Sequence, residues 1–152
     1  FELQKMLDEI CEMIRPLCMA KQQGFTVDFS NIQTNHLIGD RIKLSQVLIN
    51  LLNNACDALK QTGEKTKKIQ VMILADSRWG IIDIADNGCG IPKEDMVNIF
   101  TPFFTSKPMT KSWGMGLSLT HKIITDSGGK IDVESEVGKG TVFHIYLPVS
   151  RL

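Results

Sequence analysis

The sequence predicts an α/β fold of the α+β kind, a two-layer sandwich in which helices cover one face of a mixed, mostly antiparallel sheet. Three observations support this prediction. The chain has 152 residues, the size of one domain with a sizeable core. Stretches with helical spacing and stretches with strand character are mixed along it. Its last two predicted strands follow each other directly, which disfavours a doubly wound parallel sheet.

The N-terminal part is expected to contain one helix and one short strand. Apolar residues recur at spacings of three and four over residues 3–20, as they do on one face of a helix. Pro16 lies inside this pattern and removes a backbone hydrogen bond, so the helix is expected to bend there or to end near Arg15. After Gly24, the alternation over residues 25–29 indicates a strand.

A long helix and a hairpin are predicted in the middle of the chain. The helix is expected over residues 40–61, with Asp40 as its N-cap and Gly63 just past its end. Residues 69–74 and 80–85 are rich in Ile, Val and Leu and are bounded by turn residues, which predicts the two strands of one hairpin. The apolar stripe of the helix consists of Leu44, Leu48, Leu51, Leu52, Ala55 and Leu59.

A long irregular segment comes before the last helix and the last hairpin. Residues 86–116 are rich in proline and glycine, and irregular segments beyond about 15 residues are usually lids or binding loops in compact domains. Function is therefore expected in this segment. Residues 117–125 resume helical spacing, and residues 130–135 and 141–147 alternate as a hairpin around Gly138-Lys139-Gly140.

Charge and hydropathy exclude several classes of function. The chain has 17 Lys and Arg against 17 Asp and Glu, so its formal net charge is zero. Because binding to nucleic acids and to membrane surfaces depends mostly on concentrated positive charge, neither kind of contact is expected. No apolar run approaches the roughly 20 residues of a membrane span. The four cysteines lack metal-binding spacing, which favours reduced, buried thiols in a cytoplasmic domain.

A row of polar residues borders the apolar stripe of the long helix. Asn50, Asn54 and Asp57 fall within a narrow band at its edge. Asparagine is a mediocre helix former, so two of them one turn apart require an explanation. One explanation is a polar flank that water satisfies. The other is a row of oxygen atoms directed into a pocket, where they suit a hard cation such as Mg²⁺.

Two glycine pairs frame the irregular segment. In the first, an apolar strand runs into Asp86-Asn87-Gly88-Cys89-Gly90, which is either a hairpin turn or a buried carboxylate that accepts hydrogen bonds from a ligand amine. In the second, Gly114-Met115-Gly116 leads into a helix. It is either a flexible hinge or a helix start whose free N–H groups bind phosphate. Between the pairs, three aromatic residues and a lysine over residues 99–107 suggest docking onto a pocket or a partner.

In this order the motifs resemble the GHKL superfamily of ATP-binding domains, and most closely the catalytic and ATP-binding domain of bacterial sensor histidine kinases. Residues 46–58 (QVLINLLNNACDA) are similar to its N box, residues 86–92 (DNGCGIP) to its first glycine box and residues 99–107 to its F box. Residues 114–119 resemble its second glycine box, and residues 138–141 its last glycine motif.

The resemblance implies a Bergerat fold with a long ATP lid and cofactors ATP and Mg²⁺. Residues 1–24 are then a linker helix from a missing dimerisation and phosphoacceptor domain, and residues 25–152 are the ATP-binding catalytic domain. Asn50 and Asn54 take the catalytic role, with Asn54 as the magnesium ligand, and Asp86 accepts the adenine amine. The implied nucleotide-binding residues are Asn50, Asn54, Asp57, Asp86, Gly88, Gly90, Ile91, Phe100, Lys107, Gly114, Met115, Gly116, Leu117, Ser118 and Thr141.

The resemblance also implies an activity and partners. ATP-hydrolysing relatives carry a glutamate general base where this chain has Asn50, so transfer of the γ-phosphoryl group to a histidine is favoured over hydrolysis. That histidine is expected on a separate helical domain, because His36, His121 and His144 lack acceptor-like surroundings. A response-regulator receiver domain would take the phosphoryl group next. The full-length protein is expected to be a homodimer, either cytoplasmic or the cytoplasmic part of a membrane-anchored sensor.

Two alternatives to a histidine kinase stay open at this point. One is a non-catalytic ATP-binding docking module, which the intact motifs disfavour. The other is a Ser/Thr protein kinase of the same fold, of the anti-sigma type, which the N-terminal helix disfavours.

Overall fold

A computed structural model describes residues 5–6, 8–10, 12–13, 25–32, 41–60, 67–75, 79–101 and 116–148. The described residues between 5 and 13 are helical. The further elements, in order, are β1 (Phe25–Ile32), α2 (Arg41–Lys60), β2 (Lys67–Ala75), β3 (Trp79–Asp86), α3 (Lys93–Met96), α4 (Gly116–Asp126), β4 (Lys130–Glu136) and β5 (Gly140–Pro148).

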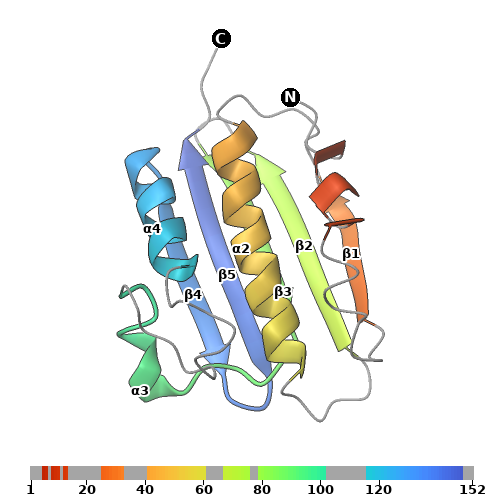
Figure 1. Cartoon of the computed structure of the whole chain (residues 1–152), viewed down its shortest axis with the longest axis vertical. Helices are drawn as coiled ribbons and strands as arrows, with labels where there is room; N and C mark the ends of the chain where they lie inside the picture. The colour runs from red at the N-terminus through yellow and green to blue at the C-terminus, as the bar shows by residue number, and fades with distance from the viewer. Residues whose placement is uncertain are drawn as a thin grey trace.

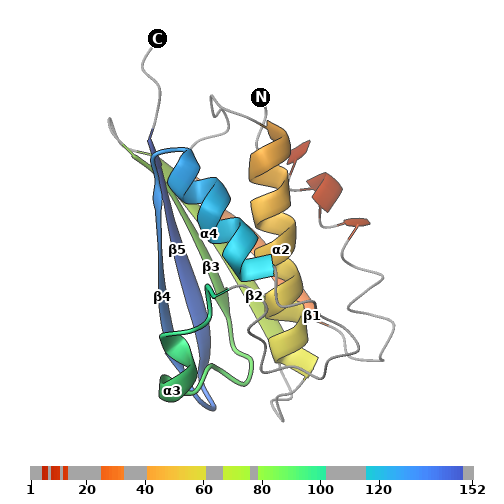
Figure 2. The same ribbon diagram turned by 60° about the vertical axis from the view of Figure 1, so that its left-hand side comes forward.

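The described strands form one sheet in the order β1-β2-β3-β5-β4. β1 runs parallel to β2, and the other neighbouring strands pair antiparallel. Both long helices, α2 and α4, lie on the same face of this sheet (Figures 1 and 2). The predicted two-layer sandwich with a mixed, mostly antiparallel sheet is therefore confirmed.

Residues that face one another across the strands form rows on the helix-covered face. One row consists of Ile73, Ile82, Ile145 and Ile131, and the next of Val71, Ile84, Phe143 and Val133. The third row, at the end of the sheet, consists of Ile69, Asp86, Thr141 and Ser135. Alternate strand residues share a face, so one face of each strand carries all three rows. The change from apolar to polar marks where the core ends.

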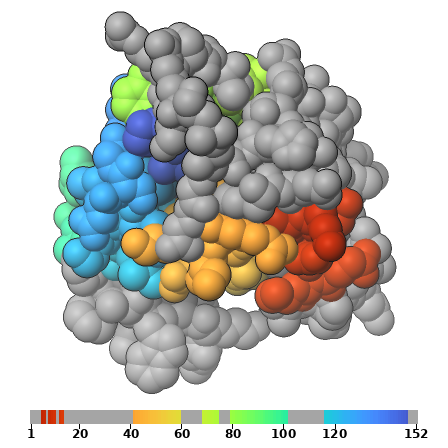
Figure 3. Space-filling view, turned by 90° about the horizontal axis from the view of Figure 1, so that it is seen from above, coloured from red at the N-terminus to blue at the C-terminus, as the bar shows by residue number. Residues whose placement is uncertain are grey.

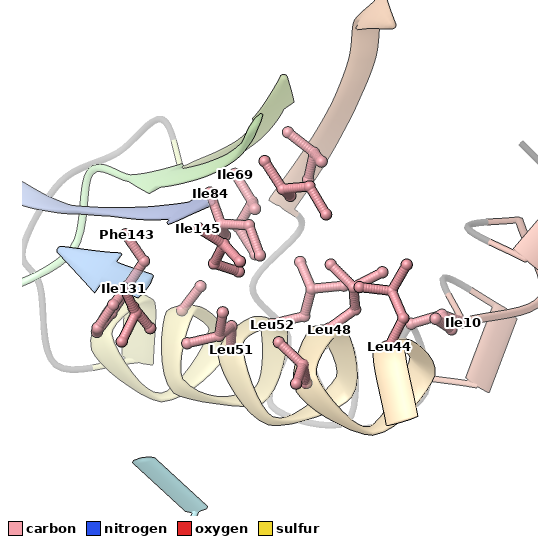
Figure 4. Packing of buried hydrophobic residues seen from close by; sticks show 14 of the residues in the cluster. Ile10, Leu44, Leu48, Leu51, Leu52, Ile69, Ile84, Ile131, Phe143 and Ile145 are labelled. Carbon is pink, nitrogen blue, oxygen red and sulfur yellow. The ribbon is translucent and has the colours of Figure 1, made fainter. Parts of the chain in front are cut away.

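Helix α2 closes the core over these rows (Figure 4). All six residues of its predicted apolar stripe are buried, together with Val47 and Cys56. Burying a leucine side chain stabilises the fold by about 1.5–3 kcal/mol, so this stripe is a main source of the stability. The stripe predicted from the sequence is therefore confirmed.

The helical residues near the N-terminus pack beside α2 (Figure 3). Met6 and Ile10 are buried in the same core as α2 and the sheet. Glu9 forms an ion pair with Arg41 at the start of α2, with 2.7 Å between Oε2 and Nη2. Part of the predicted linker helix thus contributes to the core of the domain, whereas its end near Arg15 lies outside the described residues.

Some sequence-based expectations need correction. β1 continues to Ile32, and the short helix α3 lies within the segment that was expected to be irregular. Cys56 is disulfide-bonded, so the expectation of reduced thiols is wrong for it, whereas Cys89 is a free thiol. Spacing alone does not tell which cysteines a fold brings together. None of the described helices has the length and hydropathy of a membrane-spanning helix.

Candidate active site

Those residues predicted for function that the structure describes converge at the polar end of the core. β3 ends there at Asp86, β5 starts there at Gly140, and the second half of α2 and the start of α4 flank them. In Figure 1 these parts all lie in the lower half of the molecule. Segments that are far apart in the sequence therefore supply one site.

The amide row on α2 faces the start of α4. The side-chain Nδ2 of Asn50 donates to the carbonyl oxygen of Gly116 at 3.5 Å and to Oγ1 of Thr120 at 3.4 Å. Both partners lie on one side of the amide, so its nitrogen is fixed toward α4 and its oxygen is directed away from these two groups. Asn54 and Asp57 follow at one-turn spacings and are half-buried. These three residues thus lie at the edge of the buried stripe, as predicted.

Asp86 is a desolvated carboxylate at the end of β3. Its Oδ1 accepts a hydrogen bond from the backbone N–H of Gly88 at 2.9 Å. Burial raises the pKa of Asp86 from 3.8 to about 6, although hydrogen bonds from the backbone N–H groups of Gly88 and Thr141 lower it. Above that pKa the carboxylate is an ionised acceptor with little water around it, and a ligand that donates an N–H group would compensate it.

A hydroxyl network lies beside Asp86 in the same cross-strand row. Oγ of Ser135 lies 2.8 Å from Oγ1 of Thr141 and 3.0 Å from the carbonyl oxygen of Gly140. It also accepts a hydrogen bond from the backbone N–H of Ile91 at 2.8 Å. Thr141 is 4% exposed, so its hydroxyl belongs to the floor of the site rather than to the surface.

The glycines after β3 allow the loop to pack on its own chain. A Cβ on Gly88 would lie 2.7 Å from the backbone carbon of Ala58 in α2. Gly90 has a positive φ of 77°, and its Cβ would lie 2.2 Å from the backbone oxygen of Glu136. The backbone N–H of Cys89 donates to the oxygen of Ala58 at 3.2 Å. Close packing on α2 and on the β4–β5 hairpin therefore requires these two glycines.

The start of α4 is the candidate phosphate-binding element. Gly116 has open space where a Cβ would point, and no acidic residue lies in the first turn. The first N–H groups of an α-helix lack intrahelical partners, and the helix dipole favours an anion there. Leu117 and Ser118 belong to this turn, whereas Gly114, Met115 and Lys107 lie outside the described residues.

The described aromatic residue of the predicted F box contacts α4. The ring centroids of Phe100 and His121 lie 5.1 Å apart.

His144 lies on the sheet face that the helices leave open, where Asp83 contacts its Nδ1 at 2.7 Å and Glu134 its Nε2 at 3.1 Å. Burial lowers the pKa of His144, but these hydrogen bonds outweigh burial and raise it overall. His144 is therefore held by two carboxylates on the open face of the sheet, away from the candidate site.

The donor set at the site suits a magnesium ion that arrives with a nucleotide. Among the described residues, no group of three His, Cys, Asp or Glu side chains is arranged to hold a metal. The site instead offers the amide oxygens of Asn50 and Asn54 and the carboxylate of Asp57. Mg²⁺ usually takes one or two protein ligands and completes its shell with waters and substrate phosphates. The residues present therefore fit a Mg²⁺–phosphate complex better than a metal bound by protein alone.

Two hydroxyl residues of the site, the buried Thr120 and the half-buried Ser135, were not predicted. Thr120, which contacts Asn50, has no exposed surface and also donates to the oxygen of Gly116 at 2.8 Å. Ser135 lies at an inward position of β4, where alternation calls for an apolar residue. A polar residue in an apolar pattern was the available signal in both cases.

Comparison with known proteins gives a consistent result. The sequence profile described as histidine kinase-, DNA gyrase B- and HSP90-like ATPase matches residues 39–151. The chain is 33% identical to the autoinducer 2 sensor kinase/phosphatase LuxQ of Vibrio cholerae over 98% of this chain and 18% of LuxQ. It is 38% identical to the sensor kinase CckA of Brucella abortus over 70% of this chain and 12% of CckA.

Solved structures agree with these sequence matches. The nucleotide-free catalytic domain of histidine kinase ThkA superposes with a TM-score of 0.79 at 31% identity, over 98% of this chain and 93% of that domain. The chain therefore spans 93% of the ThkA catalytic domain but only about an eighth to a fifth of the length of LuxQ and CckA.

Proposed function

We propose, from the premise that this chain belongs to the family of histidine kinase-, DNA gyrase B- and HSP90-like ATPases, that it binds Mg-ATP and transfers the γ-phosphoryl group to a histidine of a separate helical domain. It is an ATP-binding catalytic domain of the histidine-kinase type. The finer assignments of metal, site residues and partners are parts of the proposal.

The observation that carries the transferase assignment is the orientation of Asn50. Its amide nitrogen donates to two acceptors on α4, which a carboxylate could not do. Asn50 is therefore a neutral group that links α2 to α4, and it cannot act as a general base that activates water. Since a neutral imidazole already offers a lone pair to phosphorus, the transfer needs positioning and charge neutralisation rather than a base.

The nucleotide-binding residues form two ends of the site, one for the base and one for the phosphates. At the base end, Asp86 accepts from the adenine amine, Thr141 lies beside it, and Gly88, Gly90 and Ile91 form the adjoining backbone. At the phosphate end, the N–H groups of residues 114–117 bind the phosphates, and Lys107 supplies an additional charge. Phe100 and Ser118 are further nucleotide-binding residues of this end.

The α2 row completes the phosphate end. Asn54, with Asn50 beside it, holds Mg²⁺ through an amide oxygen, and Asp57 lies one turn further along α2. Bound there, Mg²⁺ would neutralise phosphate charge and orient the γ-phosphoryl group.

The partners follow from the relatives rather than from this domain. The named relatives are sensor kinases, and they are several times longer than this chain. We therefore propose a dimerisation and histidine-phosphotransfer domain as the phosphoacceptor, a response-regulator receiver domain as the next acceptor, and a homodimeric, cytoplasmic kinase region. Residues 1–24 would be the linker to the acceptor domain.

The decisive experiment supplies the missing acceptor. The domain is incubated with radiolabelled Mg-ATP and a dimeric helical fragment that carries an acceptor histidine, with Asn54→Ala as the control. Acid-labile, base-stable label on the fragment supports the proposal. Label on serine would favour a Ser/Thr kinase, and ATP binding without transfer to any cognate fragment would favour a docking module.

A further inference from the structure

The hydroxyl network beside Asp86 has only one arrangement of protons that satisfies all of its contacts. A serine hydroxyl has one hydrogen to donate and two lone pairs to accept with. The N–H of Ile91 uses one lone pair of Ser135, at 2.8 Å. The carbonyl oxygen of Gly140, at 3.0 Å, accepts only, so Ser135 must donate its single hydrogen to that oxygen.

The remaining contact then fixes the hydroxyl of Thr141. Ser135 has one lone pair left and no hydrogen, so at 2.8 Å Thr141 must donate to Ser135. In the opposite arrangement, Ser135 would donate to Thr141, and the oxygens of Ser135 and Gly140 would face each other at 3.0 Å without a hydrogen between them. Because Ser135 takes the only hydrogen of the Thr141 hydroxyl, Thr141 presents lone pairs alone to the site.

We propose that Ser135 is a specificity-determining residue, which holds Thr141 as a pure acceptor so that the site selects a purine with an amino group at position 6 over one with a carbonyl. This inference rests on the proposed function, in which Asp86 and Thr141 lie at the base end. Asp86 and Thr141 face each other directly on β3 and β5. An ionised carboxylate and an acceptor-only hydroxyl then lie side by side, and both require a donor from the ligand.

The same arrangement disfavours a carbonyl at that position. A 6-oxo purine places an acceptor oxygen where both protein groups also carry lone pairs. If Thr141 were released from Ser135, its hydroxyl could rotate and donate to that oxygen. The discrimination by the Thr141 hydroxyl therefore depends on Ser135, although Thr141 separates Ser135 from the ligand.

The test compares ATP with inosine triphosphate, which differs at position 6 and at N1. Calorimetry in Mg²⁺ buffer gives the ratio of the two dissociation constants for the domain and for Ser135→Ala. One hydrogen bond is worth a factor of about five to ten, so the preference for ATP should fall about five- to tenfold in Ser135→Ala. The ratio is the proper readout, since loss of the bond to Ile91 alone would weaken both nucleotides equally.

Matched variants separate this role from a structural one. Ser135→Thr keeps the hydroxyl and should keep the preference, and Ser127→Ala removes an exposed hydroxyl that also bonds a backbone carbonyl, at 2.8 Å, and should leave it unchanged. In a Thr141→Val background, Ser135→Ala should have no further effect on the ratio. If Ser135→Ala folds poorly, Thr141→Val alone decides the question: it removes the hydroxyl that Ser135 orients and should lower the preference for ATP, and an unchanged ratio would overturn the inference.

The inference and the proposed function fail in different ways. An unchanged ratio in Ser135→Ala, or an additive effect in the double variant, would overturn the inference while ATP binding stands. If the unmodified domain bound neither nucleotide, or if Asp86→Asn left the ratio unchanged, the assignment of the base end itself would be wrong.

Discussion

Replacing Asp86 by asparagine should stabilise the folded domain while weakening nucleotide binding. Burial raises the pKa of Asp86 from 3.8 to about 6, which corresponds to about 3 kcal/mol of destabilisation of the folded state once the carboxyl is ionised. Asparagine removes that charge but turns one acceptor into an amide nitrogen, and so loses a hydrogen bond of about 1 kcal/mol. The expected net gain near pH 7.5 is about 2 kcal/mol.

The pH dependence of this gain has a definite sign. Between pH 3.8 and about 6, the folded domain keeps a proton on Asp86 that the unfolded chain has already released. Raising the pH through this window therefore destabilises the wild-type domain relative to Asp86→Asn, and above it the difference stays constant. Below about pH 4 the charge-related advantage of the variant should vanish.

Denaturant unfolding at several pH values, followed by circular dichroism, measures this difference. In a melt, about 2 kcal/mol corresponds to a rise of roughly 4–8 °C for a domain of this size. The control is Asp126→Asn, which neutralises an exposed carboxylate paired with Lys122 and should give no comparable gain. A variant that is no more stable than wild type at pH 7.5, or a gain that does not change with pH, would refute the reasoning.

Three further predictions concern the metal, the backbone and the open sheet face. Asn54→Ala should weaken ATP binding about tenfold in the presence of Mg²⁺ but little in EDTA, whereas the neighbouring Asn53→Ala should change neither by calorimetry. Gly140→Ala should cost more than about 3 kcal/mol or prevent folding, because φ is 132° and the new Cβ would lie 2.0 Å from a backbone oxygen of β3. Gly138→Ala, with a positive φ but open space around it, should cost only about 1 kcal/mol in the same unfolding assay. His144 has a raised pKa, so its pairing should stabilise the fold fully below pH 6.5 and less as the pH rises through its folded pKa, and His144→Gln should abolish this pH dependence in unfolding experiments.

The sequence predicted the elements of this fold well because their patterns are periodic. The stripe of α2 and the inward residues of β3 and β5 repeat at the spacings that a helix and a strand require, and both sets are buried. The short helix α3 escaped because four residues are too few to show a period. The disulfide at Cys56 escaped because pairing depends on which distant segments meet.

The sequence indicated candidate residues for the site but not the contacts that these residues make. Asn50 and Asp86 stood out because each breaks a pattern at its own position. That the amide nitrogen of Asn50 bonds to Gly116 and Thr120, rather than facing a ligand, depends on how α4 packs on α2. The close approach of Gly88 to the backbone of α2 likewise depends on how two distant segments pack, and the sequence does not show it.

The third row of the sheet explains why one fold supplies both a stable core and a polar site. Two rows of apolar residues across β2, β3, β5 and β4 lie under the helices, and the next row carries Asp86, Thr141 and Ser135. Asp86 and Thr141 would be costly if they were buried without partners, but backbone N–H groups and the Ser135 hydroxyl satisfy them in part. Asp86 keeps a destabilising charge, because an acceptor that the protein satisfied fully would have little to gain from a ligand donor. The predicted gain in stability on Asp86→Asn and the predicted loss of binding are therefore two measurements of the same desolvated carboxylate.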